Sequence, residues 1–81
     1  MNNTLVIIPS FRPPDDLPNF CHKLQSQGFQ KILVVNDGSP ESYGHIFEQI
    51  RKNGIEVISE RVNRGKGYAI KAGLHHALYK Y

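Results

Sequence analysis

Three segments of the chain repeat one order of elements: an apolar run rich in β-formers, a turn, and then a helical pattern. The apolar runs lie near residues 4–9, 31–36 and 55–59. Thr4–Pro9 is apolar on both of its faces, which is typical of a strand buried inside a parallel sheet. Strands that alternate with helices at this spacing indicate right-handed βαβ units. We therefore predict an α/β fold of three βα units with a parallel sheet in the order 3-2-1.

Each apolar run is followed by apolar residues at helical spacing. The pair Pro13–Pro14 is expected to open the first helix. Ser39 is expected to cap the second helix, with Pro40 at its first position. The positions expected to face the core are Leu17, Phe20, Cys21 and Leu24 in the first helix, Tyr43, Ile46, Phe47 and Ile50 in the second, and Ile70, Leu74, Ala77, Leu78 and Tyr81 in the third.

The composition fits a single small domain over residues 1–81. With 40% hydrophobic and 21% charged residues, the chain has the balance of a globular protein rather than a disordered one. No apolar run approaches the roughly 18 residues of a membrane span, so no membrane segment is expected. The single cysteine, Cys21, excludes an internal disulfide and favours a cytoplasmic location. The net charge of +3 lacks the basic stripe of a nucleic-acid-binding protein.

Polar loops follow the carboxyl ends of all three predicted strands, and these ends share one edge of a parallel sheet. Ligands of open α/β sheets bind at this edge. Cations and glycines beside a helix start suit a phosphate, and the carboxylate of Asp37 suits a base N–H or a ribose hydroxyl. The three loops are Ser10–Arg12, Asn36–Ser39 and Arg61–Gly67. Together they predict a nucleotide site.

Each part of this edge also has a structural interpretation. Asp37–Ser39 is a common turn and cap sequence, and Asn63 with Gly65 would shape a tight loop. The basic residues of the third loop would form a solvated face, and Phe11 would close the end of the sheet. Taken singly these structural interpretations are favoured, but their gathering on one edge favours the binding site.

Other kinds of site find no support in the sequence. Gly65–Gly67 lacks the lead and the trailing Ser or Thr of a P-loop, and the turn Pro9–Pro14 has no glycine for a dinucleotide fingerprint. The four histidines do not have metal-ligand spacing. No serine has a histidine base at a recognisable spacing. We therefore predict no catalytic residue and no metal ligand in this chain.

Three segments resemble the family 2 glycosyltransferases, which have the GT-A fold. The segments are Val6–Arg12, Val34–Ser39 and Asn63–Ala69, with Gly73 following. The resemblance covers essentially the whole chain but only the first part of a typical family domain. It implies the N-terminal part of a GT-A, Rossmann-like nucleotide-binding domain that binds a nucleotide-sugar donor, with a UDP-sugar as the expected donor.

The resemblance also implies roles for single positions. Pro9–Phe11 match the segment that wraps the nucleobase, and Asp37 matches the acid that accepts from the uracil imide N–H. The basic loop matches the segment beside the base and the diphosphate. Asn36 stands where the family often has a first aspartate. The predicted nucleotide-binding residues are Pro9, Ser10, Phe11, Arg12, Asp37, Asn63, Arg64 and Lys66.

A divalent metal, Mg or Mn, is implied for the full-length enzyme. In the family an Asp-x-Asp motif after the fourth strand holds it, and this chain does not reach that motif. We therefore expect the nucleotide-binding portion of a sugar transferase that is catalytically incomplete as it stands. The alternative is a small non-catalytic nucleotide-binding or interaction domain.

The predicted strand order gives the first strand a neighbour on one side only. Between Leu5 and Ile8 this strand has no charge and no proline, the usual protection of an edge strand. We expect the chain to self-associate through this edge, most simply as a two-fold homodimer. The alternative is that loops or the third helix cover the edge and leave a monomer.

Overall fold

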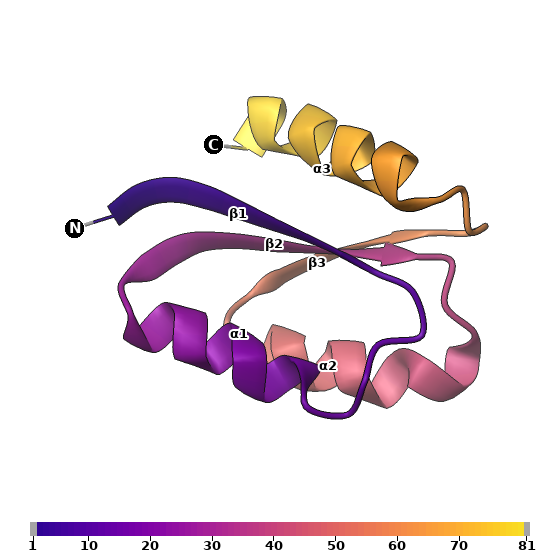
Figure 1. Ribbon diagram of the computed structural model, residues 1–81, viewed down its shortest axis with the longest axis horizontal. Coiled ribbons are helices and arrows are strands. Elements are labelled where there is room, and N and C mark those ends of the chain that lie inside the picture. Colours follow the sequence, from indigo (N-terminus) through magenta and orange to yellow (C-terminus); the bar gives the residue numbers. More distant parts are fainter. Residues whose placement is uncertain (1, 81) are drawn as a thin grey trace.

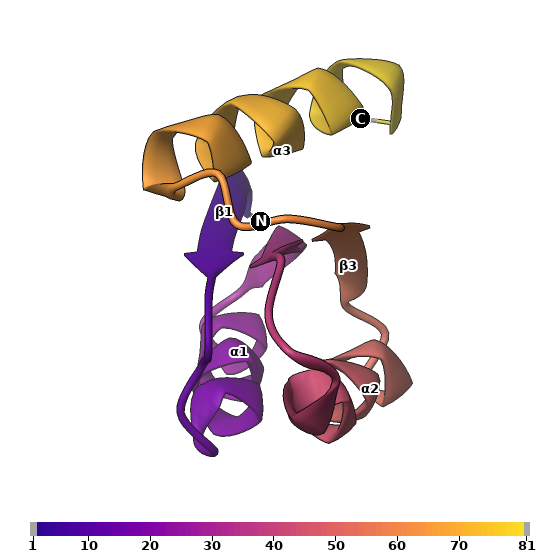
Figure 2. The same cartoon turned by 90° about the vertical axis from the view of Figure 1, so that its right-hand side faces the viewer.

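The computed structural model describes residues 2–80 and has three layers. Helices α1 and α2 lie on one face of a central sheet, and α3 lies on the other (Figures 1 and 2). In chain order the elements are β1 (Asn2–Ser10), α1 (Leu17–Ser26), β2 (Phe29–Asp37), the 3₁₀ turn η1 (Glu41–Tyr43), α2 (Gly44–Lys52), β3 (Glu56–Glu60) and α3 (Lys66–Lys80).

The sheet confirms the predicted α/β fold and strand order. Both strand pairs are parallel and the order is β1-β2-β3, with Val34 of β2 opposite Ile8 on one side and Val57 on the other. β2 is central, and three of its side chains, Leu33–Val35, have no exposed surface. Because the strands run in one direction, Ser10, Asp37 and Glu60 end them at the same edge of the sheet.

The larger core lies between the sheet and the two helices α1 and α2. The predicted apolar stripe is confirmed at Ile46, Phe47 and Ile50 of α2, which are at most 2% exposed. Burial of a side chain of this size contributes about 1.5–3 kcal/mol. The buried cluster on this face contains Leu17, Cys21, Ile32, Val34, Ile46, Phe47, Ile50, Ile55 and Val57. The fourth member of the predicted stripe, Tyr43, lies in η1 and is only partly buried against the same cluster.

The first helix begins later than the sequence pattern suggested. α1 starts at Leu17 with Pro18 in its first two positions, so Pro13–Pro14 lies in the preceding loop. Pro18 is suited to this place because the first N–H groups of a helix have no partner within the helix. The expectation that Phe20 faces the core was also wrong. Its side chain lies at the margin of the stripe formed by Leu17 and Cys21 and is 51% exposed.

The second helix also begins later than expected. Ser39 and Pro40 do not open it, because η1 intervenes and α2 starts at Gly44. Ser39 instead links two loops. Its backbone N–H donates to Asn36 Oδ1 at 3.0 Å, and its hydroxyl accepts from the backbone N–H of Arg12 at 3.0 Å. A side chain that is used between loops is not available to cap the helix.

Helix α3 packs on the other face through small residues. Ala69, Gly73 and Ala77, spaced one turn apart, are buried against the sheet. A Cβ atom at Gly73 would lie 2.8 Å from Cγ2 of Ile7, so the helix backbone approaches the sheet closely at this point. The side chains of the sheet fill the interface here, and the helix contributes little volume to it.

The predicted buried side of α3 was wrong at its large residues. Ile70, Leu74 and Leu78 are 36%, 51% and 83% exposed, and Tyr81 lies outside the described residues. Among the members of the predicted set that lie within residues 2–80, only Ala77 is buried. The helix turns its small side chains inward because a large residue would hold its backbone away from Ile7 and Val35.

Candidate nucleotide-binding site

A cavity of about 260 Å³ lies where the loops after β1, β2 and β3 meet. It is formed at the carboxyl ends of the strands, the edge at which open α/β sheets bind ligands. The structure brings all of the predicted site residues into its lining except Arg12 and Arg64. The lining residues are Pro9, Ser10, Phe11, Asp37, Asn63, Gly65 and Lys66.

Asp37 is the buried centre of this edge, with only 2% of its surface exposed. Its Oδ1 accepts a hydrogen bond from the backbone N–H of Arg64, and its Oδ2 accepts one from Asn63 Nδ2, both at 3.1 Å. The same Asn63 amide donates to the main-chain carbonyl of Asp37 at 3.1 Å. A buried carboxylate needs such partners. Asp37 therefore fixes the third loop to the end of β2.

Gly38 allows these two loops to touch backbone to backbone. Its φ angle is +71°, and a Cβ atom there would collide with the backbone nitrogen of Asn63. Any larger residue would have to push the third loop away from β2. The sequence pattern indicated a turn at Gly38, but this close approach is visible only in the structure.

A chain of hydrogen bonds joins the first loop to the strand ends. The N–H of Arg12, a residue with φ of +50°, donates to Ser39, whose N–H donates to Asn36. Asn36 Nδ2 in turn donates to the Ser59 hydroxyl at 3.5 Å. An amide accepts and donates at once, whereas an ionised aspartate only accepts. Asn36 thus has a linking role that suits an amide, and Ser59 takes part although sequence reasoning gave it no role.

Two guanidinium groups lie over aromatic rings beside the cavity. The Arg64 guanidinium carbon is 5.0 Å from the centre of the Tyr68 ring, and that of Arg12 is 5.2 Å from the Phe11 ring. Contacts at this distance are favourable cation–π interactions. Tyr68, to which sequence reasoning gave no role, lies in the first turn of α3 and contacts Arg64, which precedes that helix. The four-residue spacing of an arginine and an aromatic residue was the available signal.

The donor atoms of this edge do not fit a divalent metal. Among residues 2–80 no group of three His, Cys, Asp or Glu side chains is placed to hold an ion. The only carboxylate in the cavity lining is Asp37, and both of its oxygens accept hydrogen bonds from the third loop. Mg²⁺ is usually bound through one or two carboxylates with several waters. We assign no metal to these residues.

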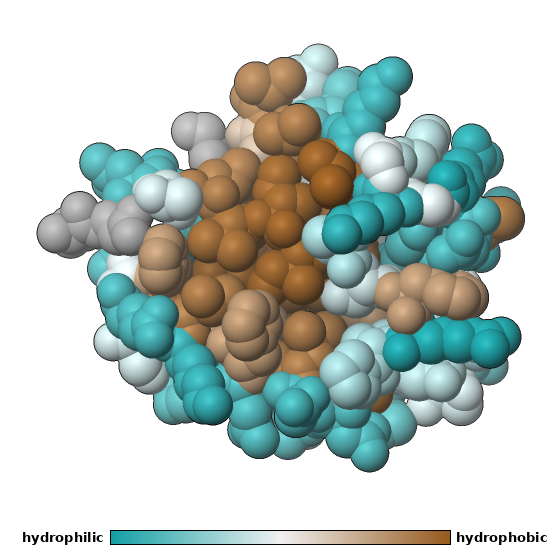
Figure 3. All heavy atoms as spheres, viewed as in Figure 1, coloured by the Kyte–Doolittle hydropathy of each residue, from teal (hydrophilic) through white to brown (hydrophobic). Residues whose placement is uncertain are grey.

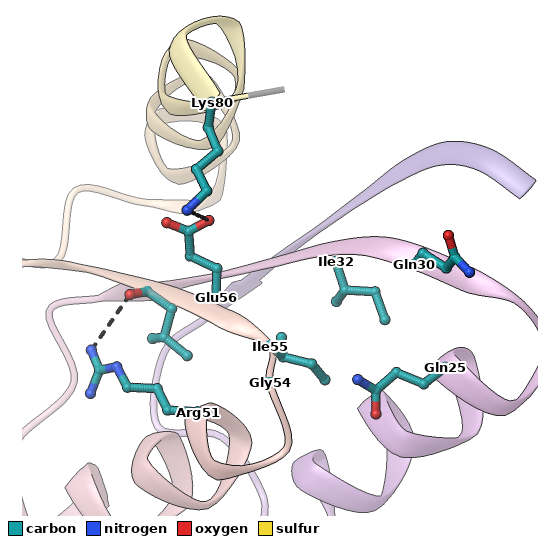
Figure 4. Close-up of a pocket in the computed structure, with 9 residues that line it drawn as sticks. Gln25, Gln30, Ile32, Arg51, Gly54, Ile55, Glu56 and Lys80 are labelled. Carbon is teal, nitrogen blue, oxygen red and sulfur yellow. Dashed lines mark hydrogen bonds and ion pairs between the residues drawn. The ribbon is translucent and has the colours of Figure 1, made fainter.

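A second cavity, of about 500 Å³, lies near the start of β3 (Figure 4). It contains charges of both signs, and the structure shows partners for them. Lys80 Nζ lies 3.5 Å from Glu56 Oε1, and Arg51 donates to the carbonyl of Val57 at 3.5 Å. These contacts join α2, β3 and α3. The carboxyl edge is therefore the better candidate for an anionic ligand.

The comparisons with known proteins identify the family of this chain. The family model described as Glycosyl transferase family 2 matches residues 5–81. The chain is 32% identical over 73 residues to an uncharacterized protein of Methanocaldococcus jannaschii, covering 90% of this chain and 29% of the relative. It is 34% identical over 53 residues to poly-beta-1,6-N-acetyl-D-glucosamine synthase of Staphylococcus epidermidis, covering 64% and 13%.

A dolichyl-phosphate beta-glucosyltransferase of Trichomonas vaginalis is 30% identical over 83 residues, which cover 88% of this chain and 25% of the relative. The chain thus spans between 13% and 29% of the length of these relatives. No solved structure matches it at a significant level. Within residues 2–80, no helix has the length and apolar character needed to cross a bilayer. The family match over nearly every residue shows that this chain belongs to glycosyl transferase family 2.

Proposed function

We propose that this chain is the nucleotide-binding portion of a family 2 glycosyltransferase and binds the nucleoside-diphosphate part of a sugar donor, with a UDP-sugar as the expected donor. One observation carries the proposal. A single cavity at the carboxyl edge of the sheet is lined by an aromatic residue, Phe11, an acid, Asp37, and a lysine, Lys66, which lie at or just after the ends of three different strands.

These three residues match two parts of a nucleotide, the base and the diphosphate. The half-exposed Phe11 ring offers a stacking face for a base. The Asp37 carboxylate accepts two hydrogen bonds within the chain, one from a backbone N–H and one from a side-chain amide. A carboxylate has roughly four acceptor sites, so it retains capacity for a base N–H. Lys66 is the first residue of α3, where the helix dipole adds to its own charge in favour of a diphosphate.

The size of the cavity suits part of a donor. Its volume of about 260 Å³ is smaller than that of most ligand pockets, which begin at about 300 Å³. We therefore assign to this cavity the base and its immediate surroundings. The sugar of the donor would extend beyond the cavity.

We further propose that this chain transfers no sugar by itself. The motivation is that its sequence contains no Asp-x-Asp pair and that the site offers no donor set for a divalent ion. A transferase assay with a panel of nucleotide-sugars and manganese is expected to give no product above a boiled control. Turnover would contradict this part of the proposal and leave the binding site standing.

Titration calorimetry with UDP and GDP, followed by amide NMR, tests the binding site. We expect UDP to shift the amide signals of the three loops. Asp37→Asn removes the charge but keeps the shape, and it should weaken binding by about 1.5–3 kcal/mol. Asp16→Asn, at an exposed carboxylate before α1, is the matched control and should bind as the wild type does.

Circular dichroism must first show that both variants are folded. Equal UDP affinities of the two folded variants would show that Asp37 only positions the third loop. No amide shift with any nucleotide would favour the alternative, a small interaction domain without a nucleotide site.

A further inference from the structure

The loop after β1 turns sharply at Arg12. Its φ angle is +50°, and among residues 2–80 it is the only residue other than glycine with a positive φ. This left-handed conformation is unfavourable for a residue with a Cβ atom, and it persists only where the surrounding structure holds it. The residue before the turn is Phe11, which lines the cavity at the carboxyl edge. The position of the Phe11 ring therefore depends on what holds Arg12.

Packing fixes the loop on either side of the turn but not at the turn itself. Ser10 and Pro13 are buried, whereas Phe11 and Arg12 between them are exposed within residues 2–80. Figure 3, drawn in the same view as Figure 1, shows a mostly hydrophilic surface on the right-hand side, where the strands end and their loops lie. The Arg12 guanidinium lies over the Phe11 ring, but this contact joins two neighbours and does not attach them to the sheet.

A hydrogen bond attaches the turn to the sheet. The backbone N–H of Arg12 donates to the Ser39 hydroxyl at 3.0 Å, between residues 27 positions apart in the chain. The backbone N–H of Ser39 in turn donates to Asn36 Oδ1 at 3.0 Å. Asn36 lies in β2 opposite Ser10, the last residue of β1. The Ser39 hydroxyl thus connects the turn to the end of the central strand.

The same strand end carries Asp37, the acid of the proposed site. Asp37 is 2% exposed and directly follows Asn36, so the sheet sets the position of its carboxylate. Phe11 reaches the same cavity from the turn that the Ser39 hydroxyl contacts. The placement of the aromatic ring relative to the carboxylate therefore depends on Ser39, which is not among the residues that line the cavity.

We propose that Ser39 is a positioning residue for base recognition, whose hydroxyl holds Arg12 in its left-handed conformation and so keeps Phe11 in place beside Asp37. This inference rests on the proposed function, which assigns the base to Phe11 and Asp37. Without the hydroxyl, the Arg12 N–H loses its partner and the turn relaxes toward more favourable conformations. Binding of the base then has to restore the turn, and the apparent dissociation constant rises by the fraction of chains in which the turn is lost.

Calorimetric titration of the 81-residue chain with UDP tests this role. Ser39→Ala should raise the dissociation constant by about three- to tenfold, the usual effect of losing one hydrogen bond. Ser39→Thr keeps the hydroxyl and should remain within about twofold of the wild type. Ser26→Ala is the matched control, because it removes a hydroxyl that donates to the His22 carbonyl within α1, and it should also remain within about twofold.

Amide hydrogen exchange measured by NMR separates positioning from a general loss of structure. In the chain without ligand, Ser39→Ala should speed the exchange of the Arg12 amide, while the Arg64 amide, which donates to Asp37, keeps its wild-type rate. In the wild type, UDP should slow exchange at Arg12, because a ligand that needs the closed turn disfavours its opening. This wild-type measurement decides the question even if Ser39→Ala does not fold.

The outcomes distinguish this inference from the function on which it rests. No binding of UDP by the wild type would overturn the proposed function and this inference with it. Binding by the wild type that weakens less than about threefold in a folded Ser39→Ala variant would overturn the inference alone. So would a Ser39→Thr variant that binds as weakly as Ser39→Ala, or an Arg12 amide that exchanges at the same rate with and without UDP.

Discussion

The two faces of the sheet are covered by helices in different ways. On the α1–α2 face, large side chains such as Phe47 and Ile50 enter a single buried cluster with the strands. On the α3 face the buried cluster is Leu33, Val35 and Ala69, and the helix brings only small side chains to it. The α1–α2 face is stabilised by large apolar side chains from both the helices and the sheet. The α3 face is stabilised by the close approach of the helix backbone to the side chains of the sheet.

The comparison shows that the large apolar side chains of a helix are not always the ones that it buries. A helix that packs through small residues leaves its large apolar side chains on its flanks, as Leu74 and Leu78 of α3 show. A helix that packs through large residues, like α2, buries those residues in the core.

The largest expected effect lies on the α1–α2 face. Phe47→Ala removes a side chain that is 2% exposed and should lower the free energy of unfolding by about 3–5 kcal/mol. Urea unfolding followed by circular dichroism measures this change. A loss below about 1 kcal/mol would mean that this face repacks easily, and the contrast between the faces would disappear.

The close approach of α3 predicts a smaller loss. Gly73→Val places atoms where Ile7 Cγ2 already lies and should lower the free energy of unfolding by about 1–3 kcal/mol. Gly67→Val is the matched control in the same helix, because a Cβ atom at Gly67 would meet nothing within 4 Å. Equal losses for the two variants would show that helix propensity, and not the contact with Ile7, explains the effect.

A polar contact at the end of α3 sharpens the comparison further. His76 Nε2 lies 2.8 Å from Glu56 Oε2 and ties the helix to β3, with both side chains partly exposed. His76→Ala should therefore lower the free energy of unfolding by only about 0.5–1 kcal/mol. His22→Ala, at an exposed position of α1, should change it less. A larger loss at His76 would make this contact a main support of the α3 face.

The smallest effect is expected for the exposed large residues of α3. Leu74→Ala truncates a side chain that is 51% exposed and should change the unfolding free energy of the monomer by less than about 0.5 kcal/mol. The measurement belongs at protein concentrations where the wild type is monomeric. A loss comparable to that of Phe47→Ala would place Leu74 in the core and would contradict the inward packing of the small residues.

The sheet could be predicted from the sequence because a parallel strand buried on both faces leaves a continuous apolar run, as in Leu33–Val35. The stripe of α2 could be predicted for a similar reason, since its large residues are also its buried ones. The buried side of α3 could not be predicted from apolar size. It depends on how much room Ile7 and Val35 leave above the sheet, and that is a property of the assembled layers.

The candidate site also has a part that the sequence predicts and a part that only the structure shows. Strand topology placed Pro9, Asp37 and Lys66 at one edge, and the structure brings them to one cavity. The hydrogen bonds from Asn63 and Arg64 to Asp37 could not be foreseen, because they join residues 26 and 27 positions apart through an irregular loop. Their consequence is that Asp37 combines the structural role of a turn residue with a place in the proposed site.

The single thiol of Cys21 is a built-in probe of local unfolding on the α1–α2 face. Cys21 has no exposed surface, and burial raises the pKa of its thiol. The reactive thiolate is therefore both scarce and inaccessible while α1 stays on the sheet. The rate at which an alkylating reagent modifies Cys21 in the native chain then reports how often α1 separates from the sheet. No engineered label is needed for this measurement. Under these conditions the thiol is protected from oxidants by the same packing that holds α1 in place.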